Sequence, residues 1–146
     1  MKRKVGLLIM SVAMMLVFSQ SAFAVTGMYD SESSALVRPS GTSVLSSELD
    51  SASDEDWYYY KNTTTSTQYF STHLSSSSYP NYFKLEAKIV YDASHTSTLF
   101  RAAKSGTIDY LYSVQLTPGA TIYLKVSTEN FGGTSQKYSL STFFNS

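Results

Sequence analysis

Apolar and polar residues alternate with a period of two along most of the chain after residue 42. The clearest segment spans residues 82–91, in which one face carries apolar residues and the other face charged ones: Phe83, Leu85, Ala87, Ile89 and Tyr91 against Lys84, Glu86 and Lys88. Alternation of this kind predicts a half-buried antiparallel strand. A loop rich in serine precedes it at residues 75–81.

The same period predicts further strands at residues 43–49, 57–61, 67–74, 98–102, 108–116, 122–126 and 138–142. In the segment 108–116 it places five residues on one side: Ile108, Tyr110, Tyr112, Val114 and Leu116. Thr117-Pro118-Gly119-Ala120 predicts a type II turn, and Gly132-Gly133 predicts another turn. No segment after residue 24 has the 3.6-residue apolar spacing of a helix. Seven or eight short strands predict an all-β fold, a single antiparallel β-sandwich or jelly roll.

The first 24 residues have the pattern of a secretory signal peptide. A basic Lys2-Arg3-Lys4 is followed by the apolar stretch 5–18 and by Ala22-Phe23-Ala24, which offers small residues at the cleavage site. The apolar stretch is shorter than the roughly 18–20 residues that span a bilayer. We therefore expect cleavage between Ala24 and Val25 and no stable membrane insertion afterwards. The expected organisation is a signal peptide at 1–24, an N-terminal linker at 25–42 and a β-sandwich domain at 43–146.

Charge and cysteine content limit the partners and the compartment. The chain has 11 Lys and Arg against 11 Asp and Glu, and removal of the three basic residues of the signal leaves 8 against 11, a net charge near −3. An acidic domain of this kind is not suited to bind nucleic acid. The chain has no cysteine, so no disulfide can support the exported domain. Export without cysteine favours a Gram-positive bacterium as the source.

Several motifs occur in an order typical of one family of secreted domains. An acidic loop runs into aromatic residues at Asp54-Glu55-Asp56-Trp57-Tyr58-Tyr59-Tyr60, and a central strand ends in Val90-Tyr91-Asp92. A Pro-Gly turn then leads into an apolar strand (116–126), and the last strand contains Tyr138-Ser139-Leu140-Ser141. Between about Tyr29 and Phe144 the chain resembles the bacterial pre-peptidase C-terminal domain family, which includes the collagen-binding domains of clostridial collagenases. The resemblance implies a jelly-roll sandwich without catalytic activity, of the kind usually appended to a secreted protease.

The resemblance also implies a calcium site. The residues at the matching positions are Asp30 and Glu32 near the start of the domain and Asp54 and Asp56 in the acidic loop. Carboxylates from two segments are suitable ligands for calcium, which takes six to eight oxygen atoms. The Glu-Pro-Asn pattern common at this entry is replaced here by Tyr29-Asp30-Ser31-Glu32. The alternative is that Asp54 and Asp56 accept backbone N–H bonds and only shape the turn.

The family's collagen-binding members place tyrosines directly after the strand that follows the Pro-Gly turn. The matching residues here are Ser127, Thr128 and Glu129, so no collagen affinity is expected.

The aromatic residues suggest a binding surface. In a strand, Trp57 and Tyr59 point away from Tyr58 and Tyr60, and the family pattern assigns Tyr58 and Tyr60 to the core. Trp57 and Tyr59, together with Tyr79 and Tyr82 of the neighbouring loop, are then candidates for an exposed patch that binds sugar rings or a protein. The alternative is that a second sheet covers them.

No catalytic constellation is recognisable. His73 and His95 are the only histidines, and the sequence contains neither a zinc-protease motif nor a nucleophile elbow. The leading hypothesis is a secreted, non-catalytic module that binds an extracellular protein or a cell-wall or matrix polymer. Two alternatives remain, a small secreted structural or antibacterial factor and a calcium-stabilised accessory domain of a partner protease. A third, an enzyme of unfamiliar type, would require His73 or His95 beside a carboxylate in a cleft.

Overall fold

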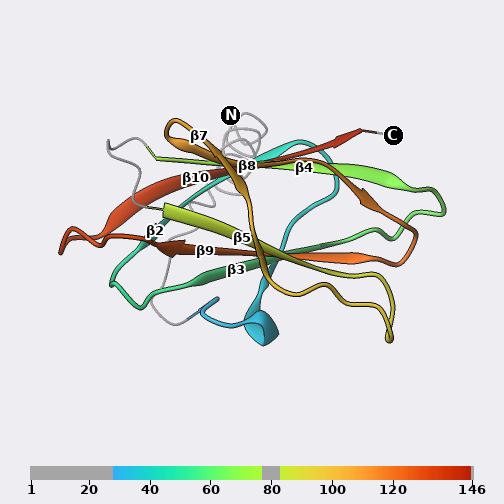
Figure 1. Cartoon of the computed structure of the whole chain (residues 1–146), viewed down its shortest axis with the longest axis horizontal. Helices are drawn as coiled ribbons and strands as arrows, with labels where there is room; N and C mark the ends of the chain where they lie inside the picture. The colour runs from blue at the N-terminus through green and yellow to red at the C-terminus, as the bar shows by residue number, and fades with distance from the viewer. Residues whose placement is uncertain (1–27, 77–82, 146) are drawn as a thin grey trace, which may run out of the picture.

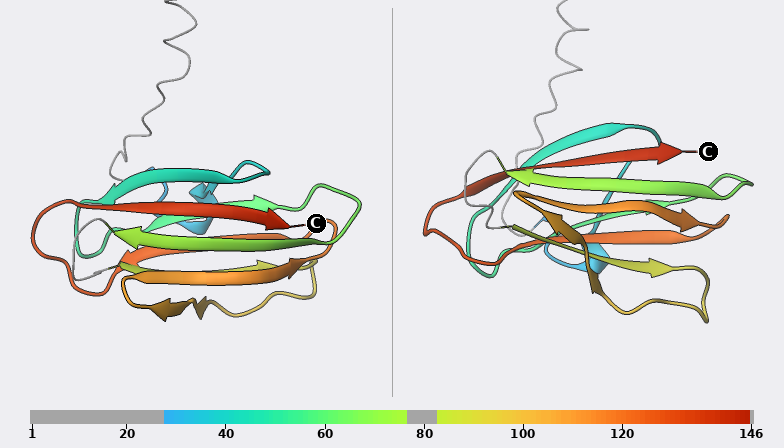
Figure 2. Two further views of the ribbon diagram at one scale, coloured as in Figure 1. Left: turned by 90° about the horizontal axis from the view of Figure 1, so that it is seen from above. Right: turned by 45° about the horizontal axis from the view of Figure 1, so that its top comes forward.

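Two five-stranded sheets pack face to face in this computed structural model, which describes residues 28–76 and 83–145 (Figure 1). The first sheet has the order β1 (Leu36–Val37), β3 (Asp56–Lys61), β9 (Thr121–Thr128), β5 (Phe83–Val90), β6 (Phe100–Arg101). The second has the order β2 (Ser43–Leu49), β10 (Gln136–Asn145), β4 (Gln68–Ser76), β8 (Ile108–Leu116), β7 (Ala103–Ser105). Figure 2 (left) looks down on the second sheet. The predicted all-β sandwich is thus confirmed, with ten strands in the described residues in place of seven or eight.

The alternation places every predicted strand correctly to within a few residues, because each of these strands buries one face. All neighbouring strands pair antiparallel except β1 and β3, which pair in parallel. Two strands were not predicted, β1 and β7, because two and three residues are too few to show a period. The expected signal peptide, with its cleavage site at Ala24 and Val25, lies outside the described residues.

The N-terminal segment is part of the sandwich. The segment expected as a linker, 25–42, contains a short 3-10 helix, η1 (Glu32–Ser34), and strand β1. The backbone N–H of Arg38 continues the pairing of β1 by donating to the carbonyl of Tyr59 at 2.7 Å. The first sheet therefore starts at Leu36, seven residues before the expected start of the domain at residue 43.

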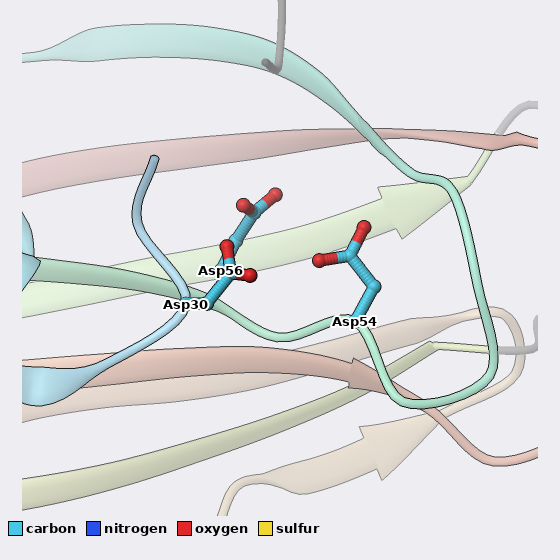
Figure 3. A group of neighbouring side chains, drawn as sticks. All are labelled: Asp30, Asp54 and Asp56. Atoms are coloured by element: carbon cyan, nitrogen blue, oxygen red, sulfur yellow. The ribbon is translucent and has the colours of Figure 1, made fainter. Parts of the chain in front are cut away.

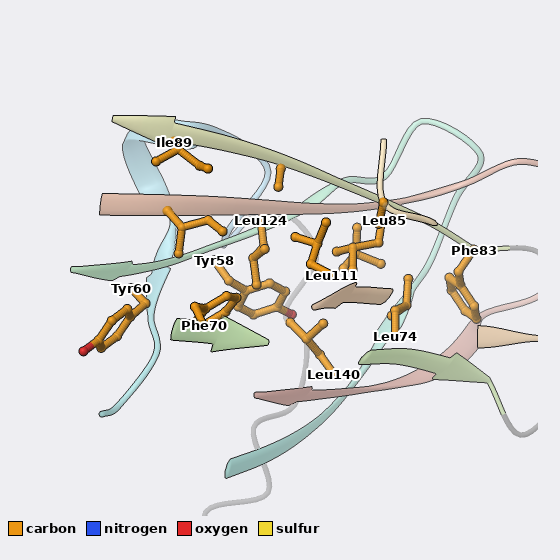
Figure 4. Close-up of a cluster of buried hydrophobic side chains, with 14 of the residues drawn as sticks. Tyr58, Tyr60, Phe70, Leu74, Phe83, Leu85, Ile89, Leu111, Leu124 and Leu140 are labelled. Carbon is orange, nitrogen blue, oxygen red and sulfur yellow. The ribbon is translucent and has the colours of Figure 1, made fainter. Parts of the chain in front are cut away.

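The core lies between the inward faces of the two sheets (Figure 4). β5 shows the pattern most clearly, because every second residue from Phe83 to Ile89 is buried. Tyr58 and Tyr60 are also buried, so the assignment of this pair to the core is confirmed. The largest fully buried side chains come from both sheets: Tyr58, Tyr138, Phe70, Phe83, Leu49, Leu74, Leu85, Leu116, Ile122, Leu124, Leu140 and Val126.

A β-bulge in β8 corrects one prediction. Leu111 is paired with Thr72 but Val114 with Phe70, so β8 has one residue more than β4 at this point. Ser113 takes up the extra residue with a φ of +51°. A bulge shifts the alternation by one position. Ile108, Tyr110 and Tyr112 consequently do not share a face with Val114 and Leu116, which pack on the core.

The predicted type II turn after β8 is present. Gly119 has a φ of +85°, and the N–H of Ala120 donates to the carbonyl of Thr117 at 3.0 Å. Asn62, at the end of β3, fastens this turn through its backbone and its buried side chain. In the part of the chain that the structure describes, no helix has the length and apolar character needed to cross a membrane.

Candidate functional site

The start of the described chain is fixed against the beginning of β3. The N–H of Trp57 donates to the carbonyl of Tyr29 at 2.8 Å. This bond places Asp30 beside the residues that lead into β3, although 24 positions separate it from Asp54 in the sequence.

Three carboxylates meet there. Asp30, Asp54 and Asp56 each offer an oxygen atom, and these atoms lie within 4.8 Å of one another. Figure 3 shows Asp30 on the N-terminal segment, and Asp54 and Asp56 on the chain that enters β3. Asp30 is exposed, whereas Asp54 and Asp56 are buried. Among the described residues, no salt bridge joins any of the three to a lysine or arginine.

Asp56 has the most perturbed environment of the three. Its side chain is only 4% exposed, and its Oδ2 accepts hydrogen bonds from the hydroxyl of Tyr138 and from Ser47 Oγ at 3.3 Å. Burial raises the pKa of Asp56 to about 6, and the nearby charge of Asp54 adds to the rise, while the hydrogen bond from Tyr138 opposes it. A carboxylate in this position is costly when charged unless a cation accompanies it.

A chain of hydroxyls extends from Asp56 between the sheets. Tyr138 of β10 donates to Asp56, so its single proton is used, and Tyr58 of β3 donates to Tyr138. Burial raises the pKa of both tyrosines. The hydroxyls are therefore neutral donors, and they leave the charge of Asp56 uncompensated.

The three carboxylates fit a calcium ion by their chemistry. They are hard oxygen donors with a combined charge of −3 when ionised, and they come from two separate segments. Asp54 also accepts a hydrogen bond from the backbone N–H of Asp50 at 2.7 Å. This bond shapes the turn, as the alternative to a metal site predicts for Asp54. Asp56 accepts only side-chain bonds among those described. Turn formation and metal binding are thus compatible here.

Glu32, the fourth expected ligand, is directed elsewhere. Its two carboxylate oxygens accept bonds from Lys88 Nζ at 2.7 and 2.6 Å. This ion pair links η1 to the outer face of β5. The structure therefore brings together three of the four predicted ligands.

The outer face of the first sheet carries Trp57 and Tyr59, both half-buried. Tyr59 lies opposite Tyr123 of β9, with ring centroids 5.9 Å apart. Lys125 Nζ lies 5.8 Å from the ring centroid of Trp57, and Lys88 Nζ lies 5.8 Å from that of Tyr123. Within residues 28–76 and 83–145, no second sheet covers these rings, because the sandwich packs the opposite face of β3 on its core. We call Trp57, Tyr59 and Tyr123 the first-sheet strip.

The two remaining members of the expected patch, Tyr79 and Tyr82, lie outside the described residues. Tyr123 was not predicted as a member. The signal for it was present in the alternation of Ile122, Leu124 and Val126, which leaves Tyr123 outward, but its partner across the sheet could not be known before the strand order.

The histidines do not form a recognisable catalytic site. His95 Nδ1 lies 2.8 Å from Asp92 Oδ2, but both side chains are more than half exposed in a turn. His73 lies on β4 between the rings of Tyr110 and Phe143. No carboxylate contact is present at His73 among the described residues.

The positions that correspond to the collagen-binding tyrosines have other roles. Ser127 is buried, and Glu129 pairs with Arg101 and with Lys104, the latter at 3.2 Å.

Known proteins were compared at the level of sequence and of structure. No protein-family profile and no curated protein sequence matches the chain. The pre-peptidase C-terminal domain of a collagenase from Bacillus anthracis is similar in structure, with a TM-score of 0.55, 15% identity, and coverage of 74% of this chain and 93% of that chain. A mitogen derived from Yersinia pseudotuberculosis is also similar, with a TM-score of 0.53, 14% identity, and coverage of 70% and 85%. At this identity the likeness concerns the fold, and the chain has the fold of a bacterial pre-peptidase C-terminal domain, as its motifs implied.

Proposed function

We propose that this chain is a secreted, non-catalytic binding module for an extracellular protein or a cell-wall or matrix polymer. The observation that carries the proposal is the first-sheet strip, in which the rings of Tyr59 and Tyr123 adjoin across two strands and Trp57 lies two residues along β3 on the same outward face. Large rings held on a rigid sheet provide contact area at a low cost in conformational entropy, and they are typical anchors of binding surfaces.

The surroundings of the strip fit a binding surface with a polar rim. Lys125 pairs with Glu55 at 2.6 Å, and Lys88 pairs with Glu32. These ion pairs hold both lysines beside the rings. Surfaces that recognise proteins usually have aromatic side chains in the middle and polar or charged side chains at the rim. The fold supports the same proposal, because it is shared with a domain of a collagenase rather than with its catalytic part.

A binding assay on immobilised partners tests the proposal. The mature protein is applied to cell wall, chitin, cellulose, collagen and a set of purified extracellular proteins. We expect binding to at least one of these, with collagen not among them, and at least tenfold weaker binding for Trp57→Ala and Tyr59→Ala. Tyr91→Ala, which removes an exposed ring from the turn after β5, serves as the matched control and leaves binding unchanged. Failure to bind any partner, or binding to every captured partner that both strip variants retain, contradicts the proposal.

A second feature, calcium stabilisation, is favoured by the three carboxylates at the start of β3. We propose that Asp30, Asp54 and Asp56 hold a calcium ion that fastens the N-terminal segment to the sandwich. The bound ion supplies positive charge to a buried carboxylate that otherwise lacks it. This assignment is independent of the partner bound at the first-sheet strip.

A further inference from the structure

A row of three rings crosses the outer face of the second sheet. His73 of β4 lies beside Tyr110 of β8, with centroids 6.4 Å apart, and beside Phe143 of β10, with centroids 5.3 Å apart. All three are half-buried, and their neighbours Thr72, Leu74 and Thr142 point into the core. The row therefore spans three adjacent central strands, β10, β4 and β8. Figure 2 (left) shows the ribbons of these strands from outside.

Exposed apolar side chains and hydroxyl groups continue the row. Tyr112 at the bulge is 73% exposed and Val44 on β2 is 66% exposed. A second row, parallel to the rings, consists of serines on three neighbouring strands, Ser46, Ser139 and Ser75. Ser46 Oγ and Ser139 Oγ lie 3.3 Å apart. The surface thus carries a row of aromatic rings beside a row of hydroxyls.

This face lacks formal charge over most of its area. The outward positions of β2 and β10 carry Glu48 and Lys137 opposite each other at one end. Beyond that pair, no Lys, Arg, Asp or Glu side chain points outward from the described residues of β2, β10, β4 and β8. The first sheet differs sharply, because charged side chains surround its strip: Lys84, Glu86, Lys88 and Lys125.

We propose that the outer face of the second sheet is a separate binding surface for a neutral polysaccharide built of pyranose rings. Sugar rings present C–H groups that stack on aromatic faces and hydroxyls that exchange hydrogen bonds with serines. On the described residues of β2, β10, β4 and β8, Lys137 is the one outward-pointing lysine or arginine, and it lies opposite Glu48 at one end, so this face offers an anionic polymer little positive charge. This assignment goes beyond the function proposed for the first sheet and does not depend on it.

Affinity electrophoresis of the mature protein tests the assignment. The gels contain a soluble neutral β-glucan, hydroxyethyl cellulose, or polygalacturonate as the anionic polymer. We expect at least one neutral polymer, and not the anionic one, to retard the protein. His73→Ala and Phe143→Ala weaken this retardation about tenfold, as loss of a stacked ring implies.

Ser141→Asp is the second variant, since it keeps every ring but places a charge beside His73, its Cα partner across β4 and β10. We expect it to fold, as thermal melting will show, and to lose the retardation. Trp57→Ala on the opposite sheet retains it. Absence of retardation by every neutral polymer, or equal retardation of the wild type and Ser141→Asp, overturns the assignment. Self-association in sedimentation that Ser141→Asp abolishes, without retardation by a neutral polymer, also overturns it and assigns the face to a second copy.

Tryptophan fluorescence separates this assignment from the proposed function. Trp57 is the only tryptophan, and it lies on the first sheet. A polysaccharide on the second sheet is expected to leave its emission unchanged, whereas a partner on the first-sheet strip changes it. A change in the emission of Trp57 on addition of the retarding polymer would show that the polymer binds the first sheet, and it would contradict the assignment to the second.

Discussion

Asp56 is a carboxylate that the fold removes almost completely from water. Its neighbours are Asp54, which repels its charge, and the hydroxyls of Tyr138 and Ser47, which stabilise it only in part. The result is a pKa raised to about 6. The folded protein therefore holds this proton at a pH at which the unfolded chain has released it, and Asp56 makes stability depend on pH.

Acidification to about pH 5 is expected to stabilise the calcium-free protein relative to about pH 7.5. Because the pKa of Asp56 is raised in the folded state, its favourable contribution is complete below the unfolded value near 4 and is lost as pH rises through about 6. Between about pH 5 and pH 7.5 the difference from Asp56 is about 1.4 kcal/mol, because only about one pKa unit of the shift is titrated over this range. Asp92 and Glu129, whose pKa values are lowered by hydrogen bonds, act in the opposite direction only at lower pH.

Thermal melting in a chelator at the two pH values measures this effect. Asp56→Asn keeps an acceptor for Tyr138 and should melt at nearly the same temperature at both. A variant that retains the full pH dependence would show that another group causes it.

Calcium should reverse this pH preference. Calcium binds the ionised carboxylates, so the rise in melting temperature on adding millimolar calcium should reach several degrees at about pH 7.5 and be much smaller at about pH 5. Asp56→Asn and Asp30→Asn should lose the response. Glu32→Gln is the matched control. Because Glu32 pairs with Lys88 and not with the three aspartates, this variant should keep the response to calcium. An unchanged melting temperature in the wild type removes calcium from the account.

The sequence and the structure agree in part on these residues. Asp54 and Asp56 stand close together in the acidic loop, and Asp30 was found through the family resemblance. Glu32 lies in the same segment as Asp30, but it forms an ion pair with Lys88. Because Lys88 comes from a strand 56 residues away, the local sequence does not predict this pair. The rings of the second sheet were missed for the same reason, since contacts among Tyr110, His73 and Phe143 depend on strand order.

At the level of secondary structure, the bulge in β8 separates two faces of one strand. Alternation alone assigns every second residue from Ile108 to Leu116 to one side, because a single extra residue leaves no mark in the pattern of apolar residues. Its physical trace is the φ of +51° at Ser113, where the N–H donates to Ser71 Oγ at 2.9 Å. The bulge leaves Tyr112 outward and turns Val114 toward the core.

Ser113→Gly should stabilise the protein by about 0.5–1 kcal/mol, because glycine adopts positive φ without steric cost. The backbone bond to Ser71 does not involve the replaced side chain. Ser139→Gly, in the extended backbone of β10, is the control and should destabilise by a similar amount. Chemical denaturation compares the two variants with the wild type. Destabilisation by Ser113→Gly would mean that Ser113 does not occupy the bulge position.

Asn62 joins two turns at the end of the sandwich. Its buried Nδ2 donates to the carbonyls of Ser66 and Leu116, both at 2.9 Å, and its Oδ1 accepts from the N–H of Thr64. The sequence shows Asn62 only as part of an Asn-Thr-Thr sequon, and its structural role depends on a strand end 54 residues away.

Asn62→Ala should cost about 2–3 kcal/mol of unfolding free energy, because it leaves the carbonyl of Leu116 buried without this donor. Thr63→Ala, at the exposed neighbouring residue, should change stability by less than about 0.5 kcal/mol. Chemical denaturation of both variants provides the measurement. Equal, small effects would contradict the role of Asn62.

The whole molecule presents two different outward surfaces on one rigid sandwich. A chain of hydrogen bonds connects the two sheets at the end where the N-terminal segment is attached, and it runs from Tyr58 through Tyr138 to Asp56. One surface combines rings with ion pairs, and the other combines rings with hydroxyls. The fold class could be predicted from the period of two, because burial of one face of each strand imposes it. The set of side chains on each surface could not be predicted from the sequence, because it depends on which strands are neighbours in the sheet.

If the first-sheet strip binds the partner of this module, as we propose, that partner must change the emission of Trp57. The mature protein is titrated with the polymer or protein captured in the binding assay, and the fluorescence of this single tryptophan is followed. We expect a saturable change in emission with the same dissociation constant as in the binding assay, and a dissociation constant at least tenfold higher for Tyr59→Ala. Tight binding of that partner with no change in Trp57 emission, and with full affinity in Tyr59→Ala, would contradict it.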